Sequence, residues 1–67
     1  MNIYYYQIKP APKSGVYSHA VNVWGAERFE DYFFSLRDAR RWVQLTEAQL
    51  RVELGRGNVQ MVERKRR

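Results

Sequence analysis

The side chains that could do acid–base or metal chemistry are scarce in this sequence of 67 residues. His19 is the single histidine, and cysteine is absent. A metal site usually needs several histidine or cysteine ligands, and a catalytic histidine needs a partner that orients it. We therefore interpret His19 as a packing residue within a strand, and we expect no metal site and no cofactor.

The acidic residues that gather in the sequence are Glu27, Glu30 and Asp31. Paired carboxylates can act in acid–base catalysis or bind Mg²⁺. Here Arg28 lies among them beside a predicted turn, which favours a solvated charged loop. The segment Gly55–Gly57 also lacks the strand and the Lys-Ser/Thr pair of a phosphate-binding loop. The sequence therefore predicts a protein that binds rather than one that catalyses.

Three arginines, Arg37, Arg40 and Arg41, follow closely on the residue where a helix is expected to begin. Cations near a helix N-terminus oppose the helix dipole, at a cost of roughly a few tenths of a kcal/mol each. A sequence selected only for stability would carry acids there, so we interpret this helix arginine cluster as a site for carboxylate or phosphate recognition. The alternative is that Asp38 and nearby acids neutralise it within the protein.

Aromatic residues supply candidate apolar anchors for a partner. Tyr4, Tyr5 and Tyr6 are consecutive, so at least one ring of the three must face away from the core of a strand-containing domain. Trp24 adjoins a predicted turn. Exposed aromatic rings near arginine are typical of interface anchors and can also stack on bases. We take Trp24, Tyr4 and Tyr6 as partner-binding candidates; the alternative is that each ring packs along the sheet.

The formal net charge is +5, and its distribution is uneven. Four of the twelve basic residues stand at the C-terminus, namely Arg64, Lys65, Arg66 and Arg67. The remaining chain has eight basic and seven acidic residues and is nearly neutral. We predict a single domain over residues 1–63 and a basic tail over 64–67. Such a tail attracts polyanions such as nucleic acid or an acidic protein surface, or it serves only as a solvated terminus.

Size and composition predict a small folded domain. A chain of this length buries only about 60% of the surface that its unfolded form exposes, so its stability margin is thin. An apolar fraction of 45%, with 15% aromatic residues, is enough for a core. No stretch is long and apolar enough to cross a bilayer, and no signal peptide is recognisable. Together with the absence of cysteine, this favours a cytoplasmic protein without a membrane partner.

The apolar pattern predicts the elements that position these residues. β-Branched and aromatic residues predict strands over 3–8, 16–24, 28–34 and 58–63. Two prolines and a Ser-Gly pair break the chain over 9–15, and Gly25-Ala26 turns it between the second and third strands.

The register of the hairpin has two alternatives. A loop of two residues would set Val23 opposite Arg28. A loop of three residues would set Val23 opposite Phe29 and His19 opposite Phe33. We favour the second register because it unites the apolar residues.

A helix is predicted between the third and fourth strands. Ser35 is a good N-cap with Asp38 three residues later, and Gly55 is a natural residue to follow the helix. The apolar positions at helical spacing are Leu36, Ala39, Trp42, Val43, Leu45, Leu50 and Leu54. The order β-β-β-α-β predicts an α+β fold, in which one helix covers one face of a three- to four-stranded antiparallel sheet.

One resemblance lies in the hairpin and the helix. Its residues are Gly15-Val16-Tyr17, Val21, Val23, Gly25, Arg28, Phe33-Phe34-Ser35, Asp38-Ala39 and Trp42. They resemble the arm-type, AP2-like DNA-binding domain of tyrosine recombinases. In that family a three-stranded sheet, backed by a helix, lies in the major groove. The acids of this hairpin depart from the family's basic sheet, and so does the strand after the helix.

A second resemblance covers more of the chain. The strands, Ser35-Leu36 with Asp38-Ala39, the amphipathic helix and the final Gly57–Val62 segment resemble small phage-encoded proteins of one sheet and one helix. These include inhibitors of bacterial RNA polymerase and anti-CRISPR proteins. The resemblance implies a phage or mobile-element protein that docks on a host protein or nucleoprotein complex and inhibits it. The alternatives are direct binding of DNA or RNA by the sheet or tail, and a purely structural subunit.

Overall fold

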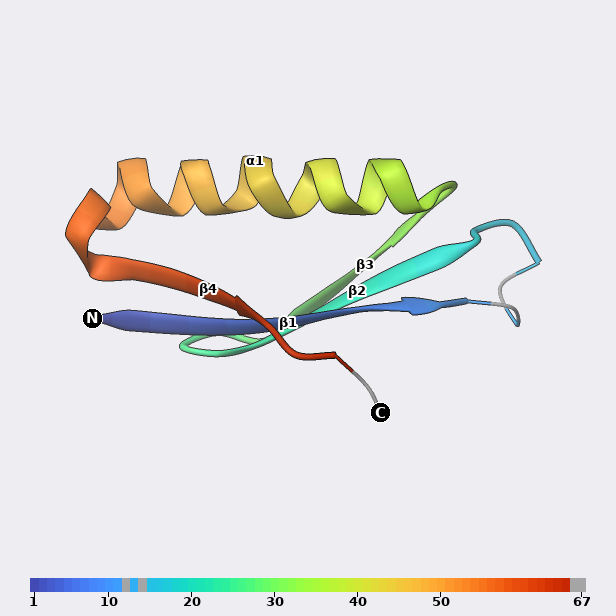
Figure 1. Ribbon diagram of the computed structural model, residues 1–67, viewed down its shortest axis with the longest axis horizontal. Helices are drawn as coiled ribbons and strands as arrows, with labels where there is room; N and C mark the ends of the chain where they lie inside the picture. The colour runs from blue at the N-terminus through green and yellow to red at the C-terminus, as the bar shows by residue number, and fades with distance from the viewer. Residues whose placement is uncertain (12, 14, 66–67) are drawn as a thin grey trace.

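The computed structural model describes residues 1–11, 13 and 15–65, so part of the predicted 9–15 turn lies outside the described residues. The chain forms four strands and one long helix, and a short 3₁₀ helix precedes the last strand (Figure 1). The elements are β1 (Asn2–Pro10), β2 (His19–Gly25), β3 (Phe29–Phe33), α1 (Leu36–Leu54), η2 (Arg56–Asn58) and β4 (Val59–Glu63). The predicted order and the α+β class with one helix on one face of the sheet are confirmed.

The strand order in the sheet is β3-β2-β1-β4. β1 pairs antiparallel with β2, and β2 pairs antiparallel with β3, whereas β4 runs parallel to β1. The prediction of a fully antiparallel sheet is therefore wrong for β4. The reason is the helix: α1 carries the chain back along the sheet to the end where β1 begins, so β4 must start there and run in the same direction (Figure 1).

The hairpin of β2 and β3 has the favoured register. Val23 pairs with Phe29 and His19 pairs with Phe33, which confirms the longer-loop alternative. Gly25 closes β2 with φ of +110°, and a Cβ there would collide with the carbonyl oxygen of Ile3. Glycine is therefore required at this turn, both for its conformation and for the close approach of β1.

The helix begins and ends as the sequence predicts. The backbone N–H of Asp38 donates to the Ser35 side chain (3.1 Å), which caps the first turn. At the other end Gly55 has φ of +96°, and its N–H donates to the Arg51 carbonyl (2.9 Å). Asn58 then donates its side-chain amide to the Leu54 carbonyl (2.9 Å), which satisfies a carbonyl that the helix leaves unpaired.

The core lies between α1 and the sheet. Its buried residues are Tyr4, Val21, Val23, Ala39, Val43 and Val59. Three residues of the predicted apolar stripe, Leu36, Leu45 and Leu54, are 42%, 59% and 38% exposed. The helix thus buries a narrower stripe than predicted, because a flat sheet contacts only one side of a helix. No helix in the described part of the chain is long and apolar enough to span a membrane.

Candidate functional site

The sheet has one face covered by α1 and one face that is uncovered in the described structure. In strands, alternate residues point to opposite faces, so the register assigns each residue to a face. The side that carries Tyr4, Val21 and Val23 is the covered face. The other side, called the open face here, carries Tyr5, Gln7, Lys9, Ala20, Asn22, Trp24, Glu30, Tyr32 and Val62.

The helix presents a second exposed surface, on the side turned away from the sheet. The exposed residues of this helix outer face are Arg37, Asp38, Arg41, Gln44, Leu45, Ala48 and Val52, with Arg40 and Arg51 at its edge. Four of these nine residues are arginine, three are apolar and one, Asp38, is acidic. Leu45 and Val52, seven residues apart, are 59% and 85% exposed. This surface therefore combines positive charge with apolar contact area.

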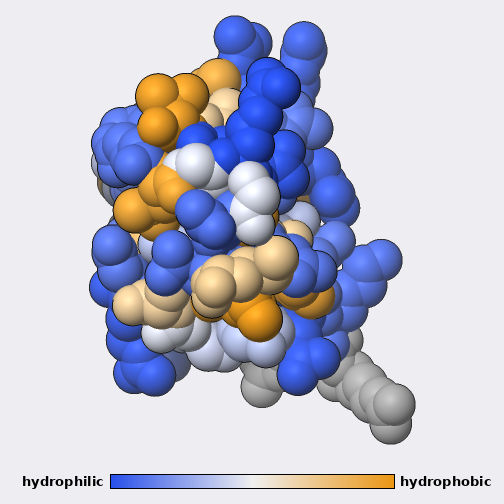
Figure 2. Space-filling view, turned by 90° about the vertical axis from the view of Figure 1, so that its left-hand side faces the viewer, coloured by the Kyte–Doolittle hydropathy of each residue, from blue (hydrophilic) through white to orange (hydrophobic). Residues whose placement is uncertain are grey.

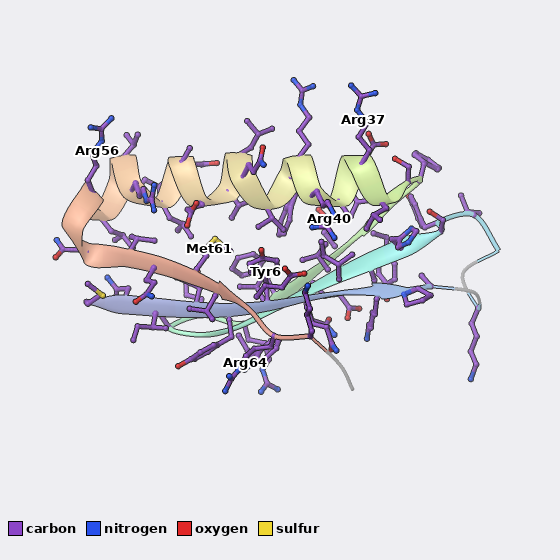
Figure 3. All side chains as sticks on the ribbon, in the orientation of Figure 1. Tyr6, Arg37, Arg40, Arg56, Met61 and Arg64 are labelled. Atoms are coloured by element: carbon purple, nitrogen blue, oxygen red, sulfur yellow. The ribbon has the colours of Figure 1, made fainter. Side chains whose placement is uncertain are left out.

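The helix arginine cluster lacks carboxylate partners. The ion pairs of the described residues join Lys9 to Glu30 (3.6 Å) and Arg51 to Glu47 (3.4 Å), and neither involves the cluster. Figure 3 shows Arg37 extending away from the sheet. Among the described residues, the protein's own acids therefore do not neutralise the cluster through ion pairs.

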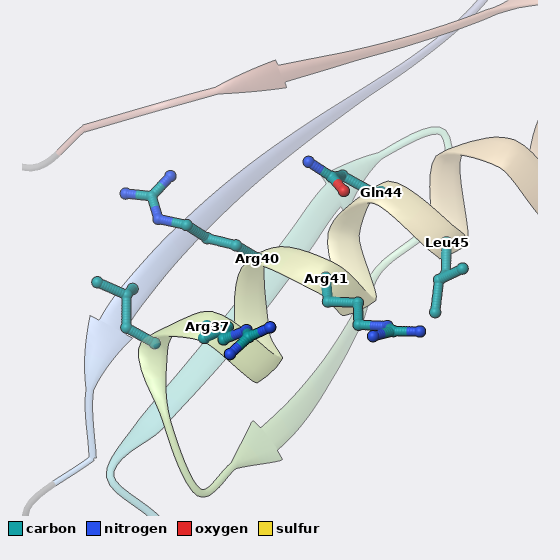
Figure 4. Close-up of a pocket in the computed structure, with 6 residues that line it drawn as sticks. Arg37, Arg40, Arg41, Gln44 and Leu45 are labelled. Carbon is teal, nitrogen blue, oxygen red and sulfur yellow. The ribbon is translucent and has the colours of Figure 1, made fainter.

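The helix arginine cluster surrounds a shallow depression. Its lining residues are Leu36, Arg37, Arg40, Arg41, Gln44 and Leu45 (Figure 4). Arg40 extends from the helix in a different direction from Arg37 and Arg41, so the guanidinium groups are spread over the surface. Towards the other end of the helix, Ala48, Arg51, Val52 and Arg56 line a further shallow hollow. Figure 2 shows this end of the molecule, where hydrophobic side chains lie among hydrophilic ones on the helix side.

Two of the three predicted aromatic anchors lie on the covered face. Tyr4 is only 1% exposed, and Tyr6 packs against the core cluster. Burial raises the pKa of both phenols, and the charge of Arg40 opposes this rise at Tyr6. Neither ring is placed as a partner anchor, because α1 covers the face to which both point. The alternation of Tyr4, Tyr6 and Ile8 in sequence carries this signal, since all three share one side of the strand.

Trp24 lies on the open face, where it meets Tyr5. The two rings stack with centroids 6.1 Å apart and an interplanar angle of 28°. They come from adjacent strands, since Tyr5 and Trp24 are register partners. Tyr5 is therefore the outward-facing ring of the N-terminal triplet, and we refer to Tyr5 and Trp24 as the ring pair.

Arg64, the first residue of the basic tail, contacts the ring pair. The guanidinium carbon of Arg64 lies 5.2 Å from the centroid of the Tyr5 ring, within cation–π range. The backbone N–H of Arg64 donates to the Tyr6 carbonyl (2.8 Å), which fixes the chain beside β1. Figure 3 shows Arg64 on the side of the sheet opposite α1. The predicted tail residues Arg66 and Arg67 lie outside the described residues.

A polar network and a second aromatic group complete the open face. Glu30 accepts a hydrogen bond from the Tyr32 hydroxyl (2.7 Å) in addition to its ion pair with Lys9. This hydrogen bond is the main cause of the raised pKa of Tyr32. Tyr17 then packs against Tyr32 (5.8 Å between centroids) and Phe34 (4.9 Å).

His19, the histidine considered for catalysis, makes contacts that are structural. The Ser18 hydroxyl lies 2.8 Å from Nδ1 of His19, and the same hydroxyl donates to the Phe34 carbonyl (2.8 Å). No group of three or more histidine or acidic side chains within the described ranges is placed to hold a metal ion. These contacts tie the start of β2 to the end of β3.

Tyr4 and Tyr6 lie on the covered face, and the predicted site residues that stay exposed divide between two surfaces. The helix arginine cluster lies on the helix outer face, and Trp24 lies on the far side of the sheet with the start of the tail. No protein-family model matches the chain, and no curated protein or solved structure matches it significantly.

Proposed function

We propose that this chain is a non-catalytic binding domain that docks through the helix outer face on an acidic surface of a host nucleic-acid-handling complex and inhibits that complex. One observation carries the proposal: the helix arginine cluster has no carboxylate partner in the described structure and lies beside exposed apolar residues. On this proposal the protein acts in the cytoplasm of the host cell.

The physical case for docking rests on what these arginines cost and what they offer. Arg37 lies in the first turn, where a cation opposes the helix dipole, and the ion pairs of the described residues do not offset that cost. A guanidinium group presents a planar fork of donors that matches a carboxylate with two parallel hydrogen bonds. Leu45 and Val52 add apolar area that a partner can bury. Charge then speeds and orients the encounter, and apolar contact slows dissociation.

The kind of partner follows from the resemblance to small phage-encoded proteins of one sheet and one helix. The α+β architecture of 67 residues supports this proposal at the level of size and design. Two targets represent the class: bacterial RNA polymerase and a CRISPR surveillance complex. Both can be assayed as purified, reconstituted reactions.

The test compares two charge-reversed proteins in both reactions. The variant R41E removes one of the proposed contacts. The control K13E makes the same change in net charge away from α1 and from the open face. We expect the wild-type protein and the control to inhibit one of the two reactions, and R41E to lose about tenfold in potency. Equal potency of the two variants would remove the helix outer face from the mechanism.

Direct binding of duplex DNA is the competing function, because the basic tail begins on the open face. The acid Glu30 and its partner Lys9 lie on that face, so the centre of the sheet offers a phosphate backbone no net attraction. We expect the affinity for a 20-base-pair duplex at about 150 mM salt to stay in the non-specific range, weaker than about 1 μM. Tighter binding that survives deletion of residues 64–67 would favour the competing function.

A further inference from the structure

The ring pair on the open face is a preformed platform. Tyr5 and Trp24 are held by strand pairing and by contact with each other, and both are half-buried. Their positions are therefore fixed before any ligand arrives, so little conformational entropy is lost on binding. No helix or strand of the described chain covers them, because α1 packs on the opposite face, and the exposed side chain of Arg64 lies over the Tyr5 ring.

Positive charge lies on both sides of the ring pair. On the β4 side, Arg64 contacts the Tyr5 ring, and Lys65 follows it in the chain. On the β3 side, Arg28 lines one hollow together with Trp24 and Glu30. A ligand stacked on the rings would therefore meet cations at both edges.

The acid on this face is already neutralised. Glu30 is paired with Lys9 and receives a hydrogen bond from Tyr32. The Asn22 amide lies between Lys9 and Glu30, and in one of its two orientations it donates to Glu30 and accepts from Lys9 Nζ (2.9 Å). Glu30 is therefore balanced by a local pair and hydrogen bonds. Glu27, in the turn beside Arg28, is a further acid near the ring pair, and Arg28, Arg64 and Lys65 outnumber it.

We propose that the open face binds single-stranded nucleic acid, with unpaired bases stacked on Tyr5 and Trp24 and with phosphates held by Arg28, Arg64 and Lys65. Planar rings combined with flanking cations are the chemistry that such strands require, since every base offers a π face and every linkage a negative charge. Duplex DNA hides its base faces and cannot use the ring pair. This site is on the other side of the molecule from the helix outer face and is independent of the proposed docking.

Fluorescence of Trp24 tests the stacking directly. The chain has two tryptophans, and Trp42 packs against Phe29 and Phe33 on the covered face. In the variant Trp42→Phe, Trp24 is the only tryptophan, and its side chain is unchanged. We expect saturable quenching by 15-nucleotide oligo(dT) or oligo(U), and the ratio of the two affinities separates DNA from RNA. A 15-base-pair duplex and inorganic polyphosphate should leave the fluorescence unchanged.

Substitutions then separate stacking from simple attraction by the tail. We expect Trp24→Ala and Tyr5→Ala each to weaken oligonucleotide binding about tenfold, and Trp24→Phe to retain most of it, because stacking on a ring contributes on this scale. Leu45→Ala, on the helix outer face, is the matched control and should bind as the parent does. Far-UV circular dichroism reports whether each variant is folded, and the Trp42→Phe titration stands without any change to the ring pair.

Three outcomes would overturn the proposal. The first is an absence of quenching at saturating oligonucleotide. The second is equal affinity for polyphosphate and oligonucleotide that is unaffected by Trp24→Ala, which would assign binding to the basic tail alone. The third is a concentration-dependent dimer in sedimentation that Trp24→Ala abolishes, which would assign the open face to a second copy of this chain.

Discussion

The two faces of the sheet carry the same kind of residue and yet lie in opposite environments. The aromatic residues of the covered side are Tyr4, Tyr6, Phe29 and Phe33, with Trp42 of α1 above them. Those of the open side are Tyr5, Trp24 and Tyr32. Tyr4 is 1% exposed whereas Tyr32 is 43% exposed. The difference arises because a single helix can cover only one face of a sheet.

Aromatic content therefore does not distinguish the covered face from the open face in this protein. The residues that lie between the rings distinguish the two faces. On the covered face they are Val21 and Val23, which are buried. On the open face they are polar residues such as Lys9 and Asn22, which keep that side in contact with water. A face with rings, amides and cations is suited to binding rather than to burial under another element.

The largest expected effect is a difference in stability between alanine variants of two neighbouring tyrosines, Tyr4 and Tyr5. Tyr4→Ala opens a cavity in the core and should destabilise the protein by about 3–5 kcal/mol, enough to unfold much of a domain this small. Tyr5→Ala removes one cross-strand ring contact and should cost about 1 kcal/mol or less. Urea denaturation of both variants measures the difference. Similar losses for the two would mean that the open face is buried in solution.

Alkaline pH should lower the stability of the protein through the tyrosines of the covered face. Burial is the main cause that raises the pKa of Tyr4 and Tyr6 above the ordinary value near 10. The unfolded chain therefore releases these phenolic protons first. The contribution of these two phenols to stability is complete below about pH 10 and falls as the pH rises further, by at most about 1.4 kcal/mol per pH unit for each proton. Urea midpoints between about pH 9 and 11.5 measure this fall. Tyr4→Phe and Tyr6→Phe should flatten it, and an unchanged slope in the double variant would contradict the assignment.

The cap of α1 should matter next, because this helix creates the difference between the two faces. Ser35→Ala removes the acceptor of the Asp38 N–H and should lower stability by about 1 kcal/mol. Ser35→Asp keeps an acceptor there and should retain most of the stability. Thermal unfolding compares the three proteins. Below the transition the near-ultraviolet circular dichroism of the ring pair should be unchanged, and a changed signal would couple the open face to the helix.

The smallest effect concerns the helix arginine cluster. Arg37→Glu places an acid in the first turn and should raise stability by about 0.3 kcal/mol. Arg51→Glu is the matched control in the last turn; it removes the pair with Glu47 and should lower stability by about 0.3–0.5 kcal/mol. Opposite shifts in melting temperature at low salt are the expected result. A loss with Arg37→Glu would show that this arginine has an internal structural role.

Local sequence signals predicted the elements and the hairpin register. Ser35 and Gly55 bound the helix because their side-chain and backbone chemistry suits its two ends. The pairing of Val23 with Phe29 followed from the alternation of apolar residues. The direction of β4 was not predictable in this way, since an antiparallel and a parallel edge strand have the same alternation.

The strands, the capped helix and the arginines near its start could be read from the chain directly, since each depends on residues that are close together in the sequence. Strand alternation places Tyr5 on the side opposite Tyr4 and Tyr6, and the packing of the helix then leaves the Tyr5 side facing outward. Only the tertiary structure decided that Trp24 and Arg64 lie on the side away from the helix arginine cluster. These outcomes depend on which face of the sheet the helix covers. That in turn depends on how much apolar surface each of the two faces, taken over all the strands together, can bury.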